Sequence, residues 1–426
     1  MVINMTPEIK ERIEQIRHGN VPEEYKKTAA GIIPKTWKQV RIGDVCVVNP
    51  LRSKFPEEQV TFLGMADVSE EGRLINPSIV DYSTVCKGFT PFERGDILVA
   101  KITPCFENGK GAYTSTLPTQ QGYGSTEFHV LRSKDIDKGY LFLHTTSYEF
   151  RKKLESEMTG SAGQKRVQTE SIASYLIGLP SSAEQHKIAE IITAQDRIIE
   201  LREKLLAEKK RQKKYLMQQL LTGKKRLPGF DGEWKSVKLS EVLSERKEKN
   251  SSQDHRVCSV AVRKGVVDQI EHLGRSYAAA DTSNYGVAHY GDIIYTKSPT
   301  GDFPYGIIKQ SHMNEDVAVS PLYGIYEPVC YEMGYILHTY FSYAVNCSNY
   351  LTPIIQKGAK NTINITNDVF VSKKLYLPMD KAEQKALAAL FAEADNEIEL
   401  LRQSIEQEKQ MKKALMQLLL TGIVRV

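Results

Sequence analysis

The chain has 426 residues, too many for one ordinary hydrophobic core, so roughly two to four domains are expected. Hydrophobic residues make up 41% of the chain and charged residues 26%, which is ordinary for a soluble protein and excludes a low-complexity class. The net charge of +5 permits a polyanionic partner but does not require one.

The cysteines and the N-terminus indicate the compartment. No C-x-x-C pair occurs, no apolar signal core opens the chain, and no apolar run approaches the ~18 residues of a membrane span. We therefore expect a cytoplasmic protein with reduced thiols, no bound metal and no membrane contact. The six cysteines are Cys46, Cys86, Cys105, Cys258, Cys330 and Cys347.

Residues 1–29 are predicted to form an amphipathic helical segment, because Ile9, Ile13 and Ile16 recur at helical spacing. No second copy of this segment occurs later in the chain. We hypothesise that it packs against the C-terminal helix.

Residues 30–180 are expected to form a first globular domain of mixed helix and strand. It opens with Trp37 and a strand-like stretch, and a Gly95-Asp96 turn enters a short apolar strand. Leu179-Pro180 closes the domain.

Residues 181–223 are predicted to form a long helix. Ser181 and Glu184 have the spacing of a capping box, in which the serine caps a backbone N–H and the glutamate reaches back. Thr222-Gly223 supplies the glycine that ends the helix. About 40 residues make roughly 60 Å of helix. The basic run 209–214 on this helix could face DNA, a protein partner or solvent, and we favour a partner.

The second half of the chain repeats this order. Trp234 follows Trp37 by 234 − 37 = 197 residues, and Gly422 follows Gly223 by 422 − 223 = 199. The second domain is expected over residues 224–378 and the second long helix over residues 379–426. The other repeated landmarks are Gly291-Asp292, Leu377-Pro378, the capping pair Asp380 and Glu383, and Arg226 with Arg425. A long-period repeat of this kind usually reflects the architecture.

Both long helices carry apolar residues at the alternating four- and three-residue spacing of a coiled coil. The predicted seam consists of Ile188, Ile192, Ile199, Leu206, Leu216, Leu220, Leu387, Phe391, Ile398, Leu401, Ile405, Leu415 and Leu419. Both seams turn polar at the same two places, at Lys209 and Lys213 and at Glu408 and Lys412.

An isolated helix of this length needs a partner for its seam. An internal two-fold would pair the two helices antiparallel, whereas the alternative is that each helix packs on its own globular domain. The predicted fold is α+β, with two globular domains in tandem repeat separated by two long antiparallel coiled-coil helices, in pseudo-two-fold symmetry.

No catalytic motif is evident in the sequence. A phosphate loop, an H-E-x-x-H pair and a G-x-S-x-G elbow are all missing. Asp231, Glu233 and Lys235 faintly resemble a nuclease set, but they lie at the repeat boundary and have no equivalent in the first copy. The sequence predicts a protein without catalytic residues of its own.

The repeated landmarks resemble those of the specificity subunits of type I restriction–modification systems, over nearly the whole chain. The resemblance rests on Leu-Pro followed by Glu184-Gln185 or Glu383-Gln384, on helices ending in Leu-Met-Gln-x-Leu-Leu-Thr-Gly, and on the first domain's Gly95-Asp96 and Pro104-Cys105-Phe106-Glu107-Asn108-Gly109-Lys110. The second domain lacks the latter stretch, so the resemblance implies that its two target recognition domains read different DNA half-sites.

The resemblance also implies the partners. These are double-stranded DNA, methyltransferase subunits (two of them) and restriction subunits. The chain itself would bind no cofactor, since S-adenosylmethionine, ATP and Mg²⁺ would belong to the partner subunits.

Polar loops in each domain are the candidate DNA-binding segments, because Arg, Lys, Asn and Gln side chains read base edges and neutralise phosphates. The candidates are Lys101, Asn108, Lys110, Gln164, Lys165, Arg166, Lys297, Lys357, Lys360 and Asn361. Two other functions stay open at this point: a stand-alone bipartite DNA-binding regulator, and a coiled-coil scaffold whose domains bind protein.

Overall fold

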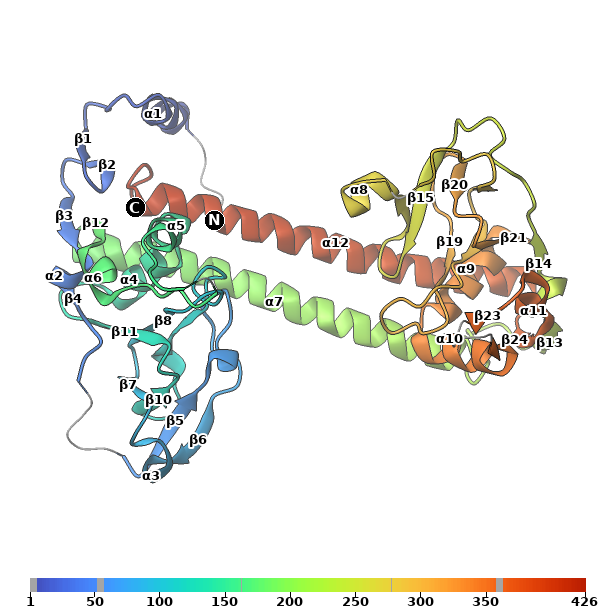
Figure 1. Ribbon diagram of the computed structural model, residues 1–426, viewed down its shortest axis with the longest axis horizontal. Coiled ribbons are helices and arrows are strands. Elements are labelled where there is room, and N and C mark those ends of the chain that lie inside the picture. The colour runs from blue at the N-terminus through green and yellow to red at the C-terminus, as the bar shows by residue number, and fades with distance from the viewer. Residues whose placement is uncertain (1–5, 52–56, 162, 277, 358–362) are drawn as a thin grey trace. The chain divides into compact units, whose positions relative to one another are not determined.

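The computed structural model describes residues 6–51, 57–161, 163–276, 278–357 and 363–426, and the chain separates into two compact units (Figure 1). Unit 1 comprises residues 1–202 and 404–426, and unit 2 comprises residues 203–403. Both divisions fall inside the long helices. The predicted domain limits, 30–180 and 224–378, fall at helix ends instead and stay a prediction.

Unit 1 contains, among its described residues, two four-stranded sheets and two strand pairs. One sheet has the order β6 (Ser78–Asp81), β5 (Gln59–Leu63), β10 (Gln121–Gly124), β7 (Thr90–Glu93). The other has the order β4 (Cys46–Val48), β11 (Phe128–Ser133), β8 (Ile97–Ala100), β9 (Gly111–Tyr113). The strand pairs are β12 (Leu176–Leu179) with β3 (Lys38–Arg41) and β1 (Tyr25–Thr28) with β2 (Gly31–Pro34). The shorter helices are α1 (Pro7–Arg17), α2 (Ile42–Val45), α3 (Tyr82–Val85), α4 (Lys138–Thr146), α5 (Tyr148–Ser156) and α6 (Thr169–Ser174).

Unit 2 has its own pair of four-stranded sheets. Their orders are β16 (Gly265–Asp268), β15 (Arg256–Ala261), β20 (Val317–Val319), β17 (Gly286–Ala288) and β14 (Leu243–Glu245), β21 (Gly324–Pro328), β18 (Ile293–Tyr295), β19 (Ile308–Gln310). The strand pairs are β13 (Lys235–Lys238) with β24 (Lys374–Leu377) and β22 (Gln356–Lys357) with β23 (Ile363–Asn364). The shorter helices are α8 (Gln269–Leu273), α9 (Tyr331–Phe341), α10 (Ala344–Leu351) and α11 (Asn367–Ser372).

The two units share one sheet topology. In each, an antiparallel sheet lies beside a mixed sheet in which a single pair is parallel, β5 with β10 in unit 1 and β15 with β20 in unit 2. In each, an early strand pairs with the strand that leads into a long helix, β3 with β12 and β13 with β24. The repeat seen in the sequence is therefore a repeat of strand order, although the loops differ.

The two long helices are α7 (Ser182–Leu220) and α12 (Lys381–Leu420), and each contributes to both units. In unit 1, Asp196 of α7 binds Lys412 of α12 at 2.7 Å. In unit 2, Lys209 binds Glu397 at 2.6 Å. A second pair in each unit gives the direction: Arg202 binds Glu408 in unit 1, and Lys213 binds Asp395 in unit 2. In both units the partner on α12 has a lower number as the residue on α7 has a higher one, so within each unit the two helices run antiparallel.

Each long helix also packs on a globular core. Ile188 of α7 and Leu419 of α12 belong to the core of unit 1 with Trp37. Met217 and Phe391 belong to a core of unit 2 with Trp234 and its neighbours. The two packing modes are therefore not alternatives: each long helix packs both on the other helix and on a globular core.

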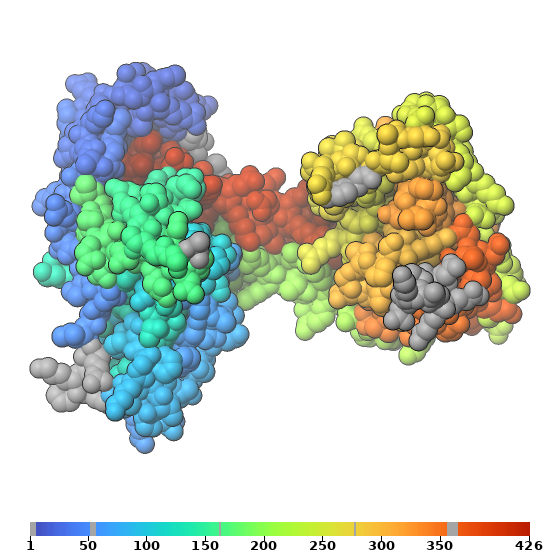
Figure 2. All heavy atoms as spheres, in the orientation of Figure 1, coloured from blue at the N-terminus to red at the C-terminus, as the bar shows by residue number. Residues whose placement is uncertain are grey.

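The N-terminal segment lies against the end of α12, as hypothesised (Figures 1 and 2). The Arg12 guanidinium donates to the carbonyl of Ile423 at 2.6 Å, and the Tyr25 hydroxyl donates to the carbonyl of Gly422 at 2.6 Å. Ile9 packs on the core of unit 1. Across the described ranges, no helix has the length and apolar character to cross a membrane.

Candidate nucleic-acid interface

Two polar loops of unit 1 lie side by side and carry six of the ten predicted DNA-binding residues. The loop after β8 spans residues 101–110, and the second spans residues 159–167. The Thr103 amide donates to the Lys165 carbonyl at 3.0 Å, and the Val167 amide donates to the Lys101 carbonyl at 2.9 Å. The backbone thus holds Lys101, Lys165 and Arg166 in one neighbourhood.

The first loop is fixed from below by a buried aromatic ring. Phe106 is fully buried, and its carbonyl accepts a hydrogen bond from the Arg151 guanidinium at 3.2 Å. Burial lowers the pKa of Arg151 to about 10. At the top of the loop, Gly109 has φ +82°, and a Cβ there would meet the Glu70 carbonyl at 2.9 Å. The motif around residues 104–110 therefore forms a compact turn that leaves Asn108 exposed.

The second loop is held by an ion pair. Arg166 donates to both carboxylate oxygens of Glu127, with distances of 2.9 and 3.0 Å. These hydrogen bonds lower the pKa of Glu127 and raise that of Arg166. Gln164 and Lys165 are exposed next to the pair. Because its guanidinium is already bound, Arg166 holds the loop that presents Gln164 and Lys165.

The remaining predicted residue of this group, Lys110, also makes an internal contact. Its ammonium donates to the Met65 carbonyl at 3.0 Å. Of the six predicted residues in unit 1, Asn108, Gln164 and Lys165 are exposed, and Lys101, Lys110 and Arg166 are partly buried.

Lys297 in unit 2 makes an equivalent internal contact. Its ammonium binds the side-chain oxygen of Asn367 at 2.5 Å, and Asn367 in turn donates to Glu245. Partial burial lowers the pKa of Lys297, although Glu245 acts in the opposite direction. Lys297 therefore ties its loop to α11. Lys357 lies in β22, whereas Lys360 and Asn361 fall outside the described residues.

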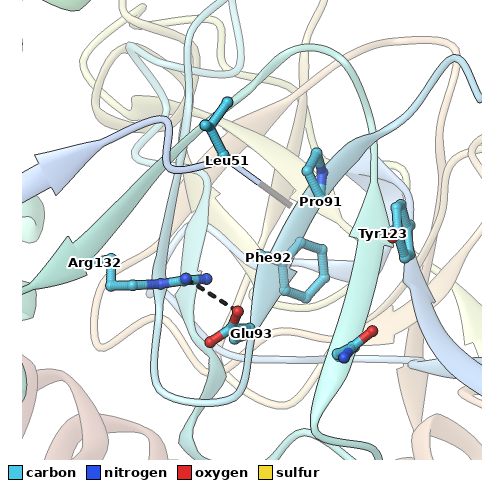
Figure 3. A pocket seen from close by; sticks show the side chains of 7 residues that line it. Leu51, Pro91, Phe92, Glu93, Tyr123 and Arg132 are labelled. Carbon is cyan, nitrogen blue, oxygen red and sulfur yellow. Dashed lines mark ion pairs between the residues drawn. The ribbon is translucent and has the colours of Figure 1, made fainter. Parts of the chain in front are cut away.

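Sequence reasoning missed the ion pairs that hold the Gly-Asp turns. In unit 1, Arg132 binds the buried Asp96 through two bonds of 2.9 and 2.7 Å. Figure 3 shows the second ion pair of Arg132, with Glu93 at 3.0 Å. In unit 2, Arg246 binds the buried Asp292 at 2.7 and 3.1 Å. The repeated Gly-Asp was a signal that the aspartate has a structural role. It did not reveal the arginine partners, because Arg132 lies in β11 whereas Arg246 follows β14, so the two are not equivalent in the repeat.

A second missed contact joins the ends of the long helices to the globular domains. In unit 1, Glu184 accepts from the Trp37 indole at 3.2 Å and from Arg425 at 2.5 and 2.8 Å. In unit 2, Glu383 accepts from the Trp234 indole at 3.1 Å and from Arg226 at 2.6 Å through both oxygens. We call these the two Trp–Glu–Arg clusters.

The predicted capping boxes are therefore half right. Ser181 and Asp380 do accept from the backbone amides of Glu184 and Glu383, at 3.3 and 3.0 Å. The glutamate carboxylates do not reach back to the cap but bind Trp and Arg side chains, because a guanidinium gives a carboxylate a charge-assisted, bidentate pair that a single backbone amide cannot.

The predicted seam residues are spread over buried and half-buried positions. Those that are buried are Ile188, Ile192, Ile199, Leu220, Leu387, Phe391, Ile398, Ile405, Leu415 and Leu419. Those that are half-buried are Leu206, Leu216 and Leu401.

Part of the basic run 209–214 is taken up by the other helix. Lys213 binds Asp395, and Lys209 binds Glu397. Arg211 pairs with Glu208, and Lys214 lies over the Tyr343 ring at 5.2 Å. Among the residues that the structure describes, no group of three or more His, Cys, Asp or Glu is arranged to hold a metal ion.

Residues 34–211 match the family model of the type I restriction modification DNA specificity domain. The chain is similar to type I restriction specificity subunits. It is 36% identical over 188 residues to the EcoAI specificity subunit of Escherichia coli. This alignment covers 42% of this chain and 32% of that protein. The chain thus spans about a third of this relative.

One further relative and one solved structure match nearly the whole chain. The MjaVIII specificity subunit of Methanocaldococcus jannaschii is 24% identical over 95% of this chain and 96% of its own length. The solved structure of a type I S subunit from M. genitalium superposes with a TM-score of 0.56 at 12% identity, covering 90% of this chain and 96% of that one. The chain therefore shares the fold of that S subunit, with mixed helices and strands.

Proposed function

We propose that this chain is the DNA-recognition subunit of a type I restriction–modification complex. The match of residues 34–211 to the DNA specificity domain carries the proposal. The repetition of its sheet order in unit 2 supports a second recognition domain in the same chain. Each target recognition domain then reads one half of a bipartite, asymmetric sequence, and the chain itself catalyses nothing.

The interface on unit 1 combines three exposed polar side chains with loops that other contacts hold in place. Asn108, Gln164 and Lys165 can reach base edges or phosphates, whereas Arg166 and Lys110 fix the loops. A rigid loop loses little conformational entropy on binding, which raises affinity. The different loops of unit 2 give a different half-site.

The two long helices form the antiparallel coiled coil of this proposal and relate the halves by an approximate two-fold. They set the distance between the half-sites and offer docking surfaces to two methyltransferase subunits and to restriction subunits. A groove of about 500 Å³ on α7, lined by Glu208, Arg211, Gln212, Tyr215 and Leu216, is one such surface. S-adenosylmethionine, ATP and Mg²⁺ belong to those subunits, and the complex works in the cytoplasm.

Mapping of adenine methylation tests this proposal. The chain is expressed with a candidate methyltransferase subunit from the same genome, in a host that lacks both. We expect a bipartite, asymmetric methylated motif that vanishes when the gene for this chain is deleted. A motif that persists without the chain would contradict the proposal. The relatives are subunits of restriction enzymes, which favours this function over a stand-alone regulator or a scaffold.

A scaffold without a DNA role makes a distinct prediction. Its DNA binding should be absent at every salt concentration, whereas phosphate contacts make the logarithm of the affinity fall linearly with the logarithm of the salt concentration.

A further inference from the structure

The ion pairs between α7 and α12 are of two kinds. The outer pairs are equivalent under the repeat, because Asp196 with Lys412 corresponds to Asp395 with Lys213 (395 − 196 = 412 − 213 = 199). Each of the two helices contributes one aspartate and one lysine to these pairs. The outer pairs set the register of two antiparallel helices but do not distinguish one helix from the other.

The inner pairs are not equivalent. Glu408 of α12 accepts from Gln195 at 2.6 Å and pairs with Arg202 at 3.0 Å, and it is only 16% exposed. The repeat places Lys209 at the position of Glu408 (408 − 199 = 209) and Leu401 at the position of Arg202. Lys209 makes the other inner pair, with Glu397. Glu397 is equivalent to Ile198 in the first copy (397 − 199 = 198), so this pair has no counterpart either.

The inner seam is therefore basic on α7 and acidic on α12. Arg202 and Lys209 of α7 both bind carboxylates of α12, Glu408 and Glu397. No such division exists at the outer pairs. A charge that differs in sign between two otherwise equivalent helices is the device by which coiled coils select unlike partners.

We propose that these inner charges make the two halves of the chain pair with each other and reject pairing of like halves. In a pair of two α7 helices, the outer Asp196–Lys213 contacts would form and fix the same register. Arg202 of each helix would then face Lys209 of the other, in place of Glu408. In a pair of two α12 helices, Glu408 would face Glu397.

The seam of α7 accordingly fits one kind of partner. That partner is an antiparallel helix with carboxylates where α12 has Glu397 and Glu408. Repulsion between like charges works against the two wrong pairings, and attraction favours the right one, so discrimination has both a positive and a negative part. The inference depends on the seam contacts alone and not on DNA recognition.

Full-length variants with altered inner charges test the proposal. The mismatched variant carries Glu397→Lys and Glu408→Lys, which makes both seams basic. The reversed variant adds Arg202→Glu and Lys209→Glu, which restores complementarity with the signs exchanged. The control variant carries Arg197→Glu and Glu399→Lys, on exposed residues that pair within their own helices, with Glu200 and Arg402.

Thermal unfolding distinguishes the outcomes. We expect the mismatched chain to unfold several degrees below wild type, or to be recovered only as aggregate. The reversed chain should regain most of that loss, and the control should stay close to wild type. A mismatched chain as stable as the control would overturn the proposal, and so would a reversed chain no better than the mismatched one.

Exchange between chains tests partner choice directly. A chain with Arg202→Glu and Lys209→Glu has two acidic seams, and the mismatched chain has two basic ones. The two chains are produced together with different tags. We expect each of them to be recovered on the other's tag, whereas two differently tagged wild-type chains should not be recovered together. Equal capture in both experiments would contradict selection by charge.

Discussion

At the scale of single residues, the two Trp–Glu–Arg clusters connect parts of the chain that are far apart in sequence. Glu383 is 1% exposed and receives both the Arg226 guanidinium and the Trp234 indole. Arg226 follows the end of α7, whereas Glu383 stands in the first turn of α12. The cluster therefore fixes the end of one long helix to the beginning of the other.

We predict that Glu383→Gln destabilises the protein by about 2–4 kcal/mol, because removing one charge of a buried pair leaves the other uncompensated. The measurement is the denaturant midpoint followed by circular dichroism. Glu399→Gln, on the exposed side of α12, is the matched control and should change the midpoint little. If both substitutions lowered the denaturant midpoint equally, the buried pair would contribute no more to stability than an exposed one.

A histidine in unit 2 gives a pH-dependent contribution. His289 lies between two carboxylates, with Nδ1 2.7 Å from Asp316 and Nε2 2.8 Å from Glu248. Partial burial lowers the pKa of His289, but the hydrogen bonds to the two carboxylates outweigh it and the net pKa is raised. The protonated form is therefore favoured by folding.

We predict that the stability difference between wild type and His289→Gln is largest below the unfolded-state pKa of about 6.5. It should shrink as the pH rises through the raised folded-state pKa, because the folded protein then loses the proton that stabilises it. The measurement is the midpoint of thermal unfolding of both proteins between mildly acidic and mildly alkaline pH. His272→Gln, on an exposed residue of α8, is the control. A difference that grows with pH would contradict the assignment.

The sequence identified these residues only in part. The offset of 199 showed that Arg226 is equivalent to Arg425 and Glu383 to Glu184. An offset states which residues correspond, but it does not state which residues touch. Because Arg226 binds Glu383 rather than its own copy's Glu184, contact follows the antiparallel pairing of the helices, and no spacing along the chain records it.

At the scale of elements, the sequence predicted the strands that follow the two Trp landmarks, β3 and β13, and those with a Gly-Asp entry, β8 and β18. The strands that pair with β8 and β18, namely β11 and β21, have no landmark in common, and the mixed sheets around β10 and β20 carry no repeated motif. A strand only three to six residues long gives little periodic signal. A strand could be predicted where a landmark motif before it occurs in both copies. It could not be predicted where only its pairing with another strand defines it.

The candidate loops show the same limit. The polar composition pointed to residues 164–166, yet it could not tell an exposed Lys165 from an Arg166 bound to Glu127. That distinction depends on β11, since Glu127 immediately precedes this strand. Sequence reasoning found the loops, and the structure sorts their side chains into those that face solvent and those that hold the loop.

We predict that Lys165→Ala weakens DNA binding and reduces the slope of log Kd against log salt by about one. The reason is the loss of one exposed cation from the loop pair. Fluorescence anisotropy with a DNA duplex containing the methylated motif provides the measurement. Lys187→Ala, on an exposed residue of α7 in the same unit, is the control. An unchanged slope for Lys165→Ala would remove this loop from the interface.

At the scale of the whole molecule, the proposed function makes the lengths of α7 and α12 a property of the DNA target. The helices contain 39 and 40 residues, and both unit divisions fall in their middle, after Arg202 and after Gln403. Arg202 contacts Ser404, so these two points lie at the same level of the antiparallel pair. Residues inserted at both points would leave every contact inside each unit intact.

We predict that inserting seven residues at each of these two points lengthens the gap between the half-sites without changing the half-sites themselves. Seven residues add about 10 Å of helix, which corresponds to about three base pairs at 3.4 Å per pair. Seven residues also nearly complete two turns, so the seam keeps its face within about 20°. Methylation mapping gives the gap directly. Insertion in α7 alone is the control and should prevent folding, because Asp196–Lys412 and Lys213–Asp395 could no longer form together. If the double insertion yields a folded, active complex with the original gap, the helices do not measure the target.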